Sequence, residues 1–176
     1  KIIQEGYSLV IRDLSFEAYK LCFGDPMQII RSYGLTIFVT VVGTFLAVFV
    51  STMTGYVLQR KDFRWGNQFS FFFFFTMLFN GGLTPSYILN TRYFGFKNSI
   101  IALIVPLAFN VWYTIIAKNY FKDIPYELVE SAKMDGANDA RIYFEIMLPV
   151  AKPLIATLIM FNALRYWNDW YNCMLY

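Results

Sequence analysis

The residues best suited to recognition chemistry lie in one polar stretch, residues 130–149, which reads ESAKMDGANDARIYFEIMLP. Its carboxylates can pair with a basic partner, and its glycine can adopt the backbone conformations that close a turn. Apolar segments flank the stretch on both sides. So compact a polar element between apolar segments indicates docking of a partner outside the bilayer. The alternative is a solvated helical hairpin that only connects two segments.

Composition argues against several other kinds of chemistry. The chain has no histidine, which removes the commonest general base and the commonest metal ligand, so no metal site is predicted. The sequence contains neither the GxxxxGK[ST] pattern that cradles nucleotide phosphates nor a Gly-x-Ser-x-Gly motif. We therefore predict no catalytic residue and no cofactor bound by this chain, which disfavours an intramembrane enzyme. A net charge of +3 without nucleic-acid patterning predicts no nucleic-acid partner.

The elements that position the polar stretch are apolar segments long enough to cross a bilayer. Hydrophobic residues make up 57% of the chain, and no Asp, Glu, Lys or Arg occurs in residues 32–59, 65–91 or 98–117. A fourth apolar run, residues 146–164, contains the single charge of Lys152. About 20 mostly apolar residues suffice to span the hydrocarbon layer. We predict one all-α transmembrane helical bundle over residues 1–176, with an extracytoplasmic or interfacial segment at 1–30, spans at about 33–58, 69–89, 99–120 and 150–166, and a polar loop at about 123–149.

Orientation follows from the lysines and arginines of the connecting loops. Residues 59–67 carry three such residues and residues 118–152 carry five, whereas residues 84–97 carry two. Because loops rich in lysine and arginine face the cytoplasm, the polar loop is predicted to be cytoplasmic. Residues 1–30 and the aromatic C-terminal cluster are then predicted to lie outside.

Two short helices are predicted within the polar loop. Pro125 suits a first helical position, and the two glutamates that follow favour the positive end of a helix. Gly136 predicts the end of this helix, because glycine tolerates the left-handed conformation of a C-terminal cap. Asn138 can cap a second helix that reaches about Met147.

The motif Glu130-Ser131-Ala132, Gly136 and Ile146-x-Leu148-Pro149 has a characteristic spacing. It resembles the EAA loop of permease subunits of binding-protein-dependent ABC importers, with Ser131 at a position usually held by alanine. The motifs in residues 56–63, 80–85, 124–128, 148–153 and 166–169 are similar to those of the carbohydrate-uptake branch. The resemblance covers nearly the whole chain and implies a type I ABC importer permease fold, with four spans here of an expected six.

The resemblance also implies roles for individual residues of the loop. Glu130 would meet a basic group of a cytoplasmic ATPase subunit, Ala132 would allow close approach, Gly136 would supply the bend and Asp135 a flanking polar contact. The implied ATPase-coupling residues are Glu127, Glu130, Ser131, Ala132, Asp135 and Gly136.

As a whole, the resemblance implies the transmembrane subunit of an ATP-driven carbohydrate importer, with an oligosaccharide as the expected substrate, in a bacterial plasma (inner) membrane. Its implied partners are a second permease subunit in a heterodimer, a dimer of ATP-binding subunits that uses ATP and Mg, an extracytoplasmic sugar-binding protein and membrane lipid. The alternatives are a permease of the same architecture for a polyamine or phosphonate and, more remotely, an intramembrane enzyme or a structural scaffold.

Polar and aromatic side chains in the last two predicted spans are candidates for a substrate path, because sugars bind to aromatic faces and planar hydrogen-bonding groups. The alternative explanation of Trp167, Trp170 and Tyr171 is an interfacial aromatic belt. The two asparagines within the spans can instead hydrogen-bond between helices, and Arg165 can extend to the interface. The candidate path residues are Asn110, Trp112, Tyr113, Asn162, Arg165, Trp167 and Asn168.

Overall fold

The computed structural model describes residues 16–176, which contain helices and no strand. The all-α prediction is therefore confirmed for this range. Residues 1–15 of the predicted extracytoplasmic segment lie outside the described residues. The elements are α2 (Glu17–Cys22), α3 (Pro26–Gln59), α4 (Gly66–Leu78), α5 (Leu83–Ile88), η1 (Leu89–Tyr93), α6 (Ile101–Ile104), α7 (Val111–Asp123), α8 (Glu127–Met134), α9 (Asp139–Arg141), η2 (Ile142–Met147), α10 (Leu148–Val150), α11 (Lys152–Trp167) and α12 (Trp170–Leu175), where η marks a π-helical stretch.

The chain divides into two compact units, residues 1–35 and residues 36–176, and the single domain over residues 1–176 remains a prediction. In the described part of the first unit, α2 is followed by a turn and by the first turns of α3. Asp25 caps α3, because its Oδ1 accepts a hydrogen bond from the Gln28 amide at 3.3 Å. Pro26 then begins the helix, where its missing N–H costs no hydrogen bond.

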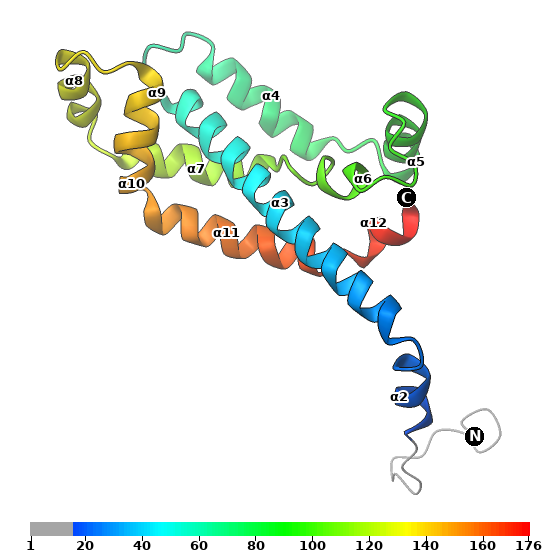
Figure 1. Ribbon diagram of the computed structural model, residues 1–176. Helices are drawn as coiled ribbons and strands as arrows, with labels where there is room; N and C mark the ends of the chain where they lie inside the picture. Colours follow the sequence, from blue (N-terminus) through cyan, green and yellow to red (C-terminus); the bar gives the residue numbers. More distant parts are fainter. Residues whose placement is uncertain (1–15) are drawn as a thin grey trace, which may run out of the picture. The chain divides into compact units, whose positions relative to one another are not determined.

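In the second unit, α3 packs against α7 and α11. Gly55 of α3 lies so close to α7 that an added Cβ would stand 2.7 Å from the Ala117 Cβ and 2.8 Å from the Lys118 backbone nitrogen. Gly43 is covered by the Tyr166 ring of α11 in the same way. Small residues thus allow a close approach of the helices. Figure 1 shows α8 at one end of this unit, and α5 and α12 at the other end.

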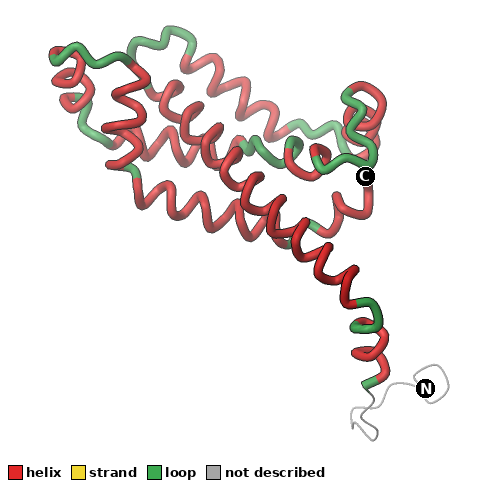
Figure 2. The backbone as a smooth tube through the Cα atoms, in the orientation of Figure 1, coloured by secondary structure: helices red, strands yellow, loops and turns green. Residues whose placement is uncertain are grey.

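Two predicted spans are interrupted in the structure. After α4 the chain leaves helical geometry, and α5 starts at an angle of 113° to it, as the glycines at 81 and 82 and Pro85 predict. The segment expected over 99–120 is α6 and α7 separated by residues 105–110, because Pro106 offers no amide for an α-helical hydrogen bond. Figure 2 shows both interruptions as loops.

Within the described residues, α3 alone is a single helix long and apolar enough to cross a membrane. Up to three such segments exist if each of two bent helix pairs counts as one span, α4 with α5–η1 and α9–α10 with α11–α12. The four-span arrangement remains a prediction. The phenylalanines of α4 agree with a lipid-facing surface, because Phe71 and Phe72 are 71% and 57% exposed.

Candidate functional site

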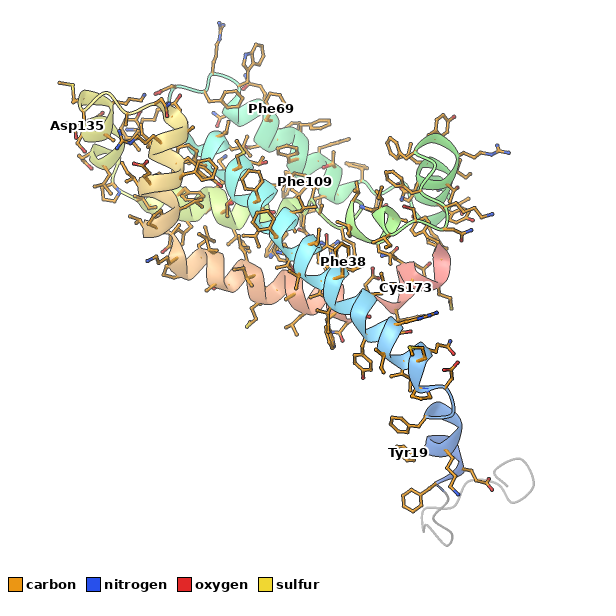
Figure 3. The ribbon with its side chains drawn as sticks, in the orientation of Figure 1. Tyr19, Phe38, Phe69, Phe109, Asp135 and Cys173 are labelled. Atoms are coloured by element: carbon orange, nitrogen blue, oxygen red, sulfur yellow. The ribbon has the colours of Figure 1, made fainter. Side chains whose placement is uncertain are left out.

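The polar loop forms two short helices joined by a tight turn, as predicted. In the turn after α8 the Ala137 amide donates to the Ala132 carbonyl and the Gly136 amide to the Lys133 carbonyl, both at 3.0 Å. Gly136 has a φ of +79°, so this is a Schellman cap that requires glycine. Asn138 then caps the second helix, since its Oδ1 accepts from the Arg141 amide at 2.8 Å. Figure 3 shows Asp135 where α8 ends, remote from Cys173 in α12.

Helix α8 has one buried and one exposed face. Val129 and Ala132 are 2% and 6% exposed and belong to the apolar core of the second unit. The helical period places Glu127, Glu130, Ser131 and Met134 on the opposite face, and all four are exposed. The carboxylates of Glu127 and Glu130 have no ion-pair partner among the described residues. This exposed face is suited to contact with another molecule, whereas Ala132 approaches the core of its own chain.

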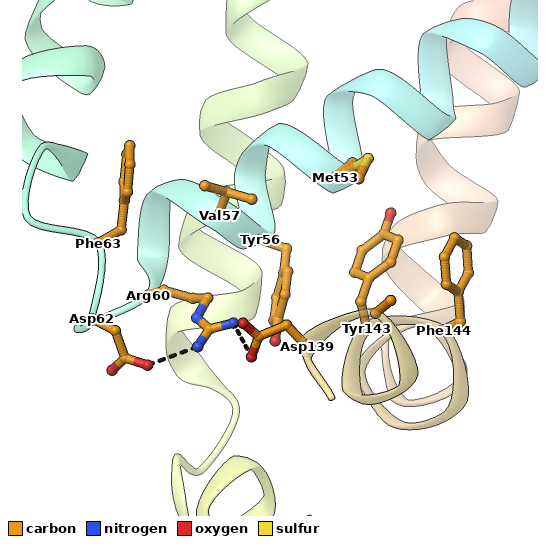
Figure 4. A pocket seen from close by; sticks show the side chains of 10 residues that line it. Met53, Tyr56, Val57, Arg60, Asp62, Phe63, Asp139, Tyr143 and Phe144 are labelled. Atoms are coloured by element: carbon orange, nitrogen blue, oxygen red, sulfur yellow. Dashed lines mark hydrogen bonds and ion pairs between the residues drawn. The ribbon is translucent and has the colours of Figure 1, made fainter. Parts of the chain in front are cut away.

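An ion-pair network joins α8 and α9, the two short helices of the polar loop, to the end of α3. The Arg60 guanidinium, whose side chain is 11% exposed, lies 2.7 Å from Asp62 and 2.5 Å from Asp139 at the start of α9. Figure 4 shows Arg60 between these two carboxylates, at the edge of a cavity of about 410 Å³. Burial alone would lower the pKa of Arg60, but the hydrogen bonds to the two carboxylates outweigh burial and raise it.

Asp62 extends the network to α8. Its carboxylate accepts from Lys133 Nζ at 2.6 Å and from the Tyr126 hydroxyl at 3.0 Å. The hydrogen bonds from Lys133, Arg60 and Tyr126 hold the pKa of Asp62 well below its usual range. Burial and the Asp62 charge raise the pKa of Tyr126. We call the set Arg60, Asp62, Lys133 and Asp139 the brace.

An apolar seam accompanies the brace. Tyr56 of α3, Phe121 of α7 and Val129 of α8 belong to one buried cluster, with Tyr56 and Phe121 rings 5.9 Å apart in edge contact. Tyr143 of η2 joins the same cluster, and its hydroxyl lies 2.9 Å from Thr52 Oγ1 of α3. Burial raises the pKa of Tyr143, and the Thr52 hydrogen bond opposes this only in part. The loop element is therefore packed onto α3, not suspended beside it.

Several of these residues were not among the predicted site residues. Asp62, the sole carboxylate in a loop with three basic side chains, indicates a local ion pair, and it forms one with Arg60, but its second partner Lys133 is 71 residues away. Met134 is 88% exposed and was missed because methionine serves both in core packing and at binding surfaces, so its residue type does not indicate which. Leu128, which is 39% exposed, adds a second apolar side chain to the outside of α8.

The predicted substrate-path asparagines are engaged by their own helices. Asn110 caps α7, with Oδ1 accepting from the Trp112 amide at 2.9 Å. Asn168 Nδ2 donates to the Leu164 carbonyl at 2.9 Å. Asn162 is fully buried, and its Nδ2 donates to the Leu158 carbonyl at 2.8 Å, whereas its Oδ1 has no partner among the described residues. These bonds lie within or cap single helices, so none is the predicted bond between helices.

The aromatic and basic path residues differ in exposure. Trp112 and Trp167 are 56% and 48% exposed, in keeping with either a lipid interface or a path. Tyr113 of α7 stacks on Phe161 of α11, with ring centroids 6.1 Å apart. Arg165 donates to the Leu107 carbonyl at 3.3 Å, which anchors one end of its guanidinium to the broken segment between α6 and α7.

Comparison with known proteins gives consistent similarities. The chain is 39% identical over its whole length to the polygalacturonan/rhamnogalacturonan transport system permease protein YtcP of Bacillus subtilis (strain 168), of which it covers 61%. It is 36% identical over its whole length to protein LplC of the same organism, covering 59%. The crystal structure of a bacterial ABC transporter involved in the import of the acidic polysaccharide alginate contains a chain 33% identical, with a TM-score of 0.80 over 95% of this chain and 59% of that one.

The chain thus spans about 60% of the length of these relatives. Residues 27–170, which include both the brace and the exposed face of α8, match a single family. The chain belongs to the family of binding-protein-dependent transport system inner membrane components.

Proposed function

We propose that this chain is the transmembrane subunit of an ATP-driven importer for oligosaccharides of acidic polysaccharides, and that α8 couples it to a cytoplasmic ATPase. The carrying observation is the exposed face of α8, where Glu127 and Glu130 lack ion-pair partners among the described residues and Met134 stands 88% exposed. In this proposal the chain catalyses no reaction, ATP and Mg are used by the ATPase subunits, and a second permease completes a heterodimer.

The free energy required explains why the contact must be extended. Shifting a two-state cavity from 1:99 to 99:1 takes about 5.5 kcal/mol of differential binding. One exposed ion pair supplies about 0–1 kcal/mol, so Glu130 alone is insufficient. Burying a methionine or leucine side chain contributes about 1.5–3 kcal/mol. Met134 and Leu128 together with the two glutamates reach the required range when the ATPase contacts them in one state of the cavity and not in the other.

The substrate class rests on the relatives. YtcP is named for polygalacturonan and rhamnogalacturonan, and the solved transporter for the acidic polysaccharide alginate. Arg165 suits a carboxylated sugar, because a guanidinium has five donors and its Nη1 contact to Leu107 leaves others available. Trp167 and Trp112 offer exposed aromatic faces for sugar rings. The lysines and arginines of the loops predict a cytoplasmic α8, and α8 lies at the opposite end of the second unit from α5 and α12.

The test uses the full-length permease, assembled in nanodiscs with its partner permease, ATPase and binding protein. The readout is ATPase activity stimulated by binding protein loaded with oligogalacturonides or with neutral oligosaccharides of equal length. We expect Glu130→Lys to lower stimulation by both loaded forms, because it reverses a docking charge. Asp123→Lys, which reverses an exposed charge outside α8, should leave stimulation unchanged.

Two results would contradict separate parts of the proposal. Stimulation of the Glu130→Lys complex at the level of the unmodified complex would refute the coupling role of α8. Equal stimulation by acidic and neutral oligosaccharides would refute the substrate class. An Arg165→Gln variant that keeps the preference for the acidic form would refute the role of Arg165 in that preference.

A further inference from the structure

We propose that a basic cavity at the ends of α3, α4 and α7 binds the headgroup phosphate of an anionic phospholipid, with an acyl chain in the adjoining apolar cavity. The basic cavity measures about 420 Å³. No carboxylate lines it. Its five cationic side chains are those of Arg60, Lys61, Arg64, Lys118 and Lys122. The inference follows from membership of a membrane-component family and does not depend on the proposed substrate.

Most of these cations are uncompensated. Arg60 is engaged in the brace, but the other four cationic side chains make no ion pair among the described residues. Lys118 and Lys122 are four residues apart on α7, a spacing at which like charges repel. A phosphate between them would replace this repulsion with attraction. The charge pattern therefore calls for an anion from outside the chain.

The position of Lys118 points to a lipid as the source of this anion. Its ammonium is partly buried and donates one hydrogen bond, to Ser70 Oγ at 2.7 Å, which leaves two donors. Lys118 and Leu58 line both the basic cavity and a second cavity of about 200 Å³. Phe73, Phe74 and Ile115 form apolar walls of that second cavity between α4 and α7. A phosphate joined to a hydrocarbon chain matches this pair of cavities, whereas free phosphate would leave the apolar cavity unused.

The surrounding elements place the basic cavity at the level of a membrane interface. It lies where the apolar helices α3 and α7 end and α4 begins. Trp65, which is 55% exposed, stands beside Arg64, as expected of an aromatic anchor at headgroup level. Basic pockets between membrane helices on the cytoplasmic side are known to take anionic headgroups. The alternative occupant of the basic cavity is an acidic protein surface, and the experiment distinguishes it from a lipid.

The experiment measures lipid retained by the full-length permease complex, using native mass spectrometry from micelles doped with phosphatidylglycerol or phosphatidylcholine. Lys122→Gln, at an exposed position that leaves the fold unchanged, should lower phosphatidylglycerol retention roughly fivefold. Lys118→Gln combined with Lys122→Gln should lower it more than tenfold. The matched control Lys152→Gln removes an exposed cation outside the cavity and should change nothing.

The remaining arms distinguish the possible ligands. Ile115→Gln should lower phosphatidylglycerol retention through the apolar cavity, and excess inorganic phosphate should fail to displace the lipid. Equal retention by Lys122→Gln and Lys152→Gln, or displacement by inorganic phosphate alone, would overturn the proposal. Loss of the ATPase subunit from the double variant with unchanged lipid retention would also overturn it, in favour of a protein-docking surface.

Discussion

The brace gives a quantitative prediction for Arg60→Met. Methionine keeps much of the apolar stem but removes the hydrogen bonds to Asp62 and Asp139. A charged hydrogen bond contributes about 1.5–3 kcal/mol when desolvated, and an exposed ion pair about 0.2–1 kcal/mol. The two carboxylates are 45% and 64% exposed and Arg60 only 11%, so each bond falls between these limits, at about 1 kcal/mol. Arg60→Met should therefore destabilise the protein by about 2 kcal/mol.

The assay is a double-mutant cycle of Arg60→Met and Asp139→Asn on the free energy of unfolding of the full-length permease in micelles. We expect a coupling energy of about 1 kcal/mol. The pair Arg141 and Glu145 is the internal control, because both side chains are more than half exposed, at 63% and 60%, and lie four residues apart. Its cycle should give a smaller coupling energy than that of the brace pair. A brace coupling no larger than that of the control would refute the reasoning that burial of Arg60 strengthens the pair.

Three further predictions concern the docking face, the helix contact and the pH dependence. Met134→Ser should weaken binding of the ATPase subunit by about 10-fold or more in a titration, since it removes most of a side chain whose burial on docking contributes about 1.5–3 kcal/mol. Unchanged affinity would exclude Met134 from the contact. Gly55→Val should abolish assembly, as its Cβ would lie 2.7 Å from the Ala117 Cβ, whereas Gly34→Ala, with no atom within 4 Å, should be tolerated in the same expression and size-exclusion assay. Because the pKa of Asp62 is lowered in the folded state, its stabilisation is complete above the unfolded value of about 4 and is lost as pH falls below it. The stability difference between the unmodified protein and Asp62→Asn should thus be constant above about pH 5 and narrow toward pH 3; a constant difference throughout would contradict this assignment.

Local signals in the sequence correctly predicted the two short helices of the polar loop. Gly136 and Asn138 act on backbone groups within a few residues, so their caps do not depend on the rest of the fold. Pro85 and the glycines before it likewise marked the end of α4. The interruption between α6 and α7 was underestimated, since Pro106 kinks some membrane helices and breaks others, and Asn110 begins a new helix here.

Contacts across the fold could not be predicted in this way. Lys133 lies in α8 and Asp62 in the loop after α3, and only the packing of α8 against α3 and α7 brings them together. Burial of Ala132 has the same origin, because motif spacing does not tell which side of a short helix meets the core. Asn110 and Asn168 are predicted path residues, and the sequence did not indicate that Asn110 Oδ1 and Asn168 Nδ2 make hydrogen bonds within their own helices.

The strength of the join between α8 and α3 bears on how a docked ATPase could move the membrane helices. Burial of Val129 contributes about 1.5–3 kcal/mol and the bond from Arg60 to Asp139 about 1 kcal/mol, and the bond from Lys133 to Asp62 adds to these. Their sum is comparable to the ~5.5 kcal/mol that a two-state switch requires from the docked partner. Pivoting α8 away from α3 would therefore cost about as much free energy as docking can supply. A displacement of α8 is instead passed to the ends of α3 and α7, because close-packed side chains transmit strain with little compression.

We infer that loss of the brace should reduce stimulated ATPase activity even where the ATPase still binds, since the contact would then move α8 without moving the helices behind it. Unchanged stimulation in the Arg60→Met complex would show that the apolar seam suffices for transmission.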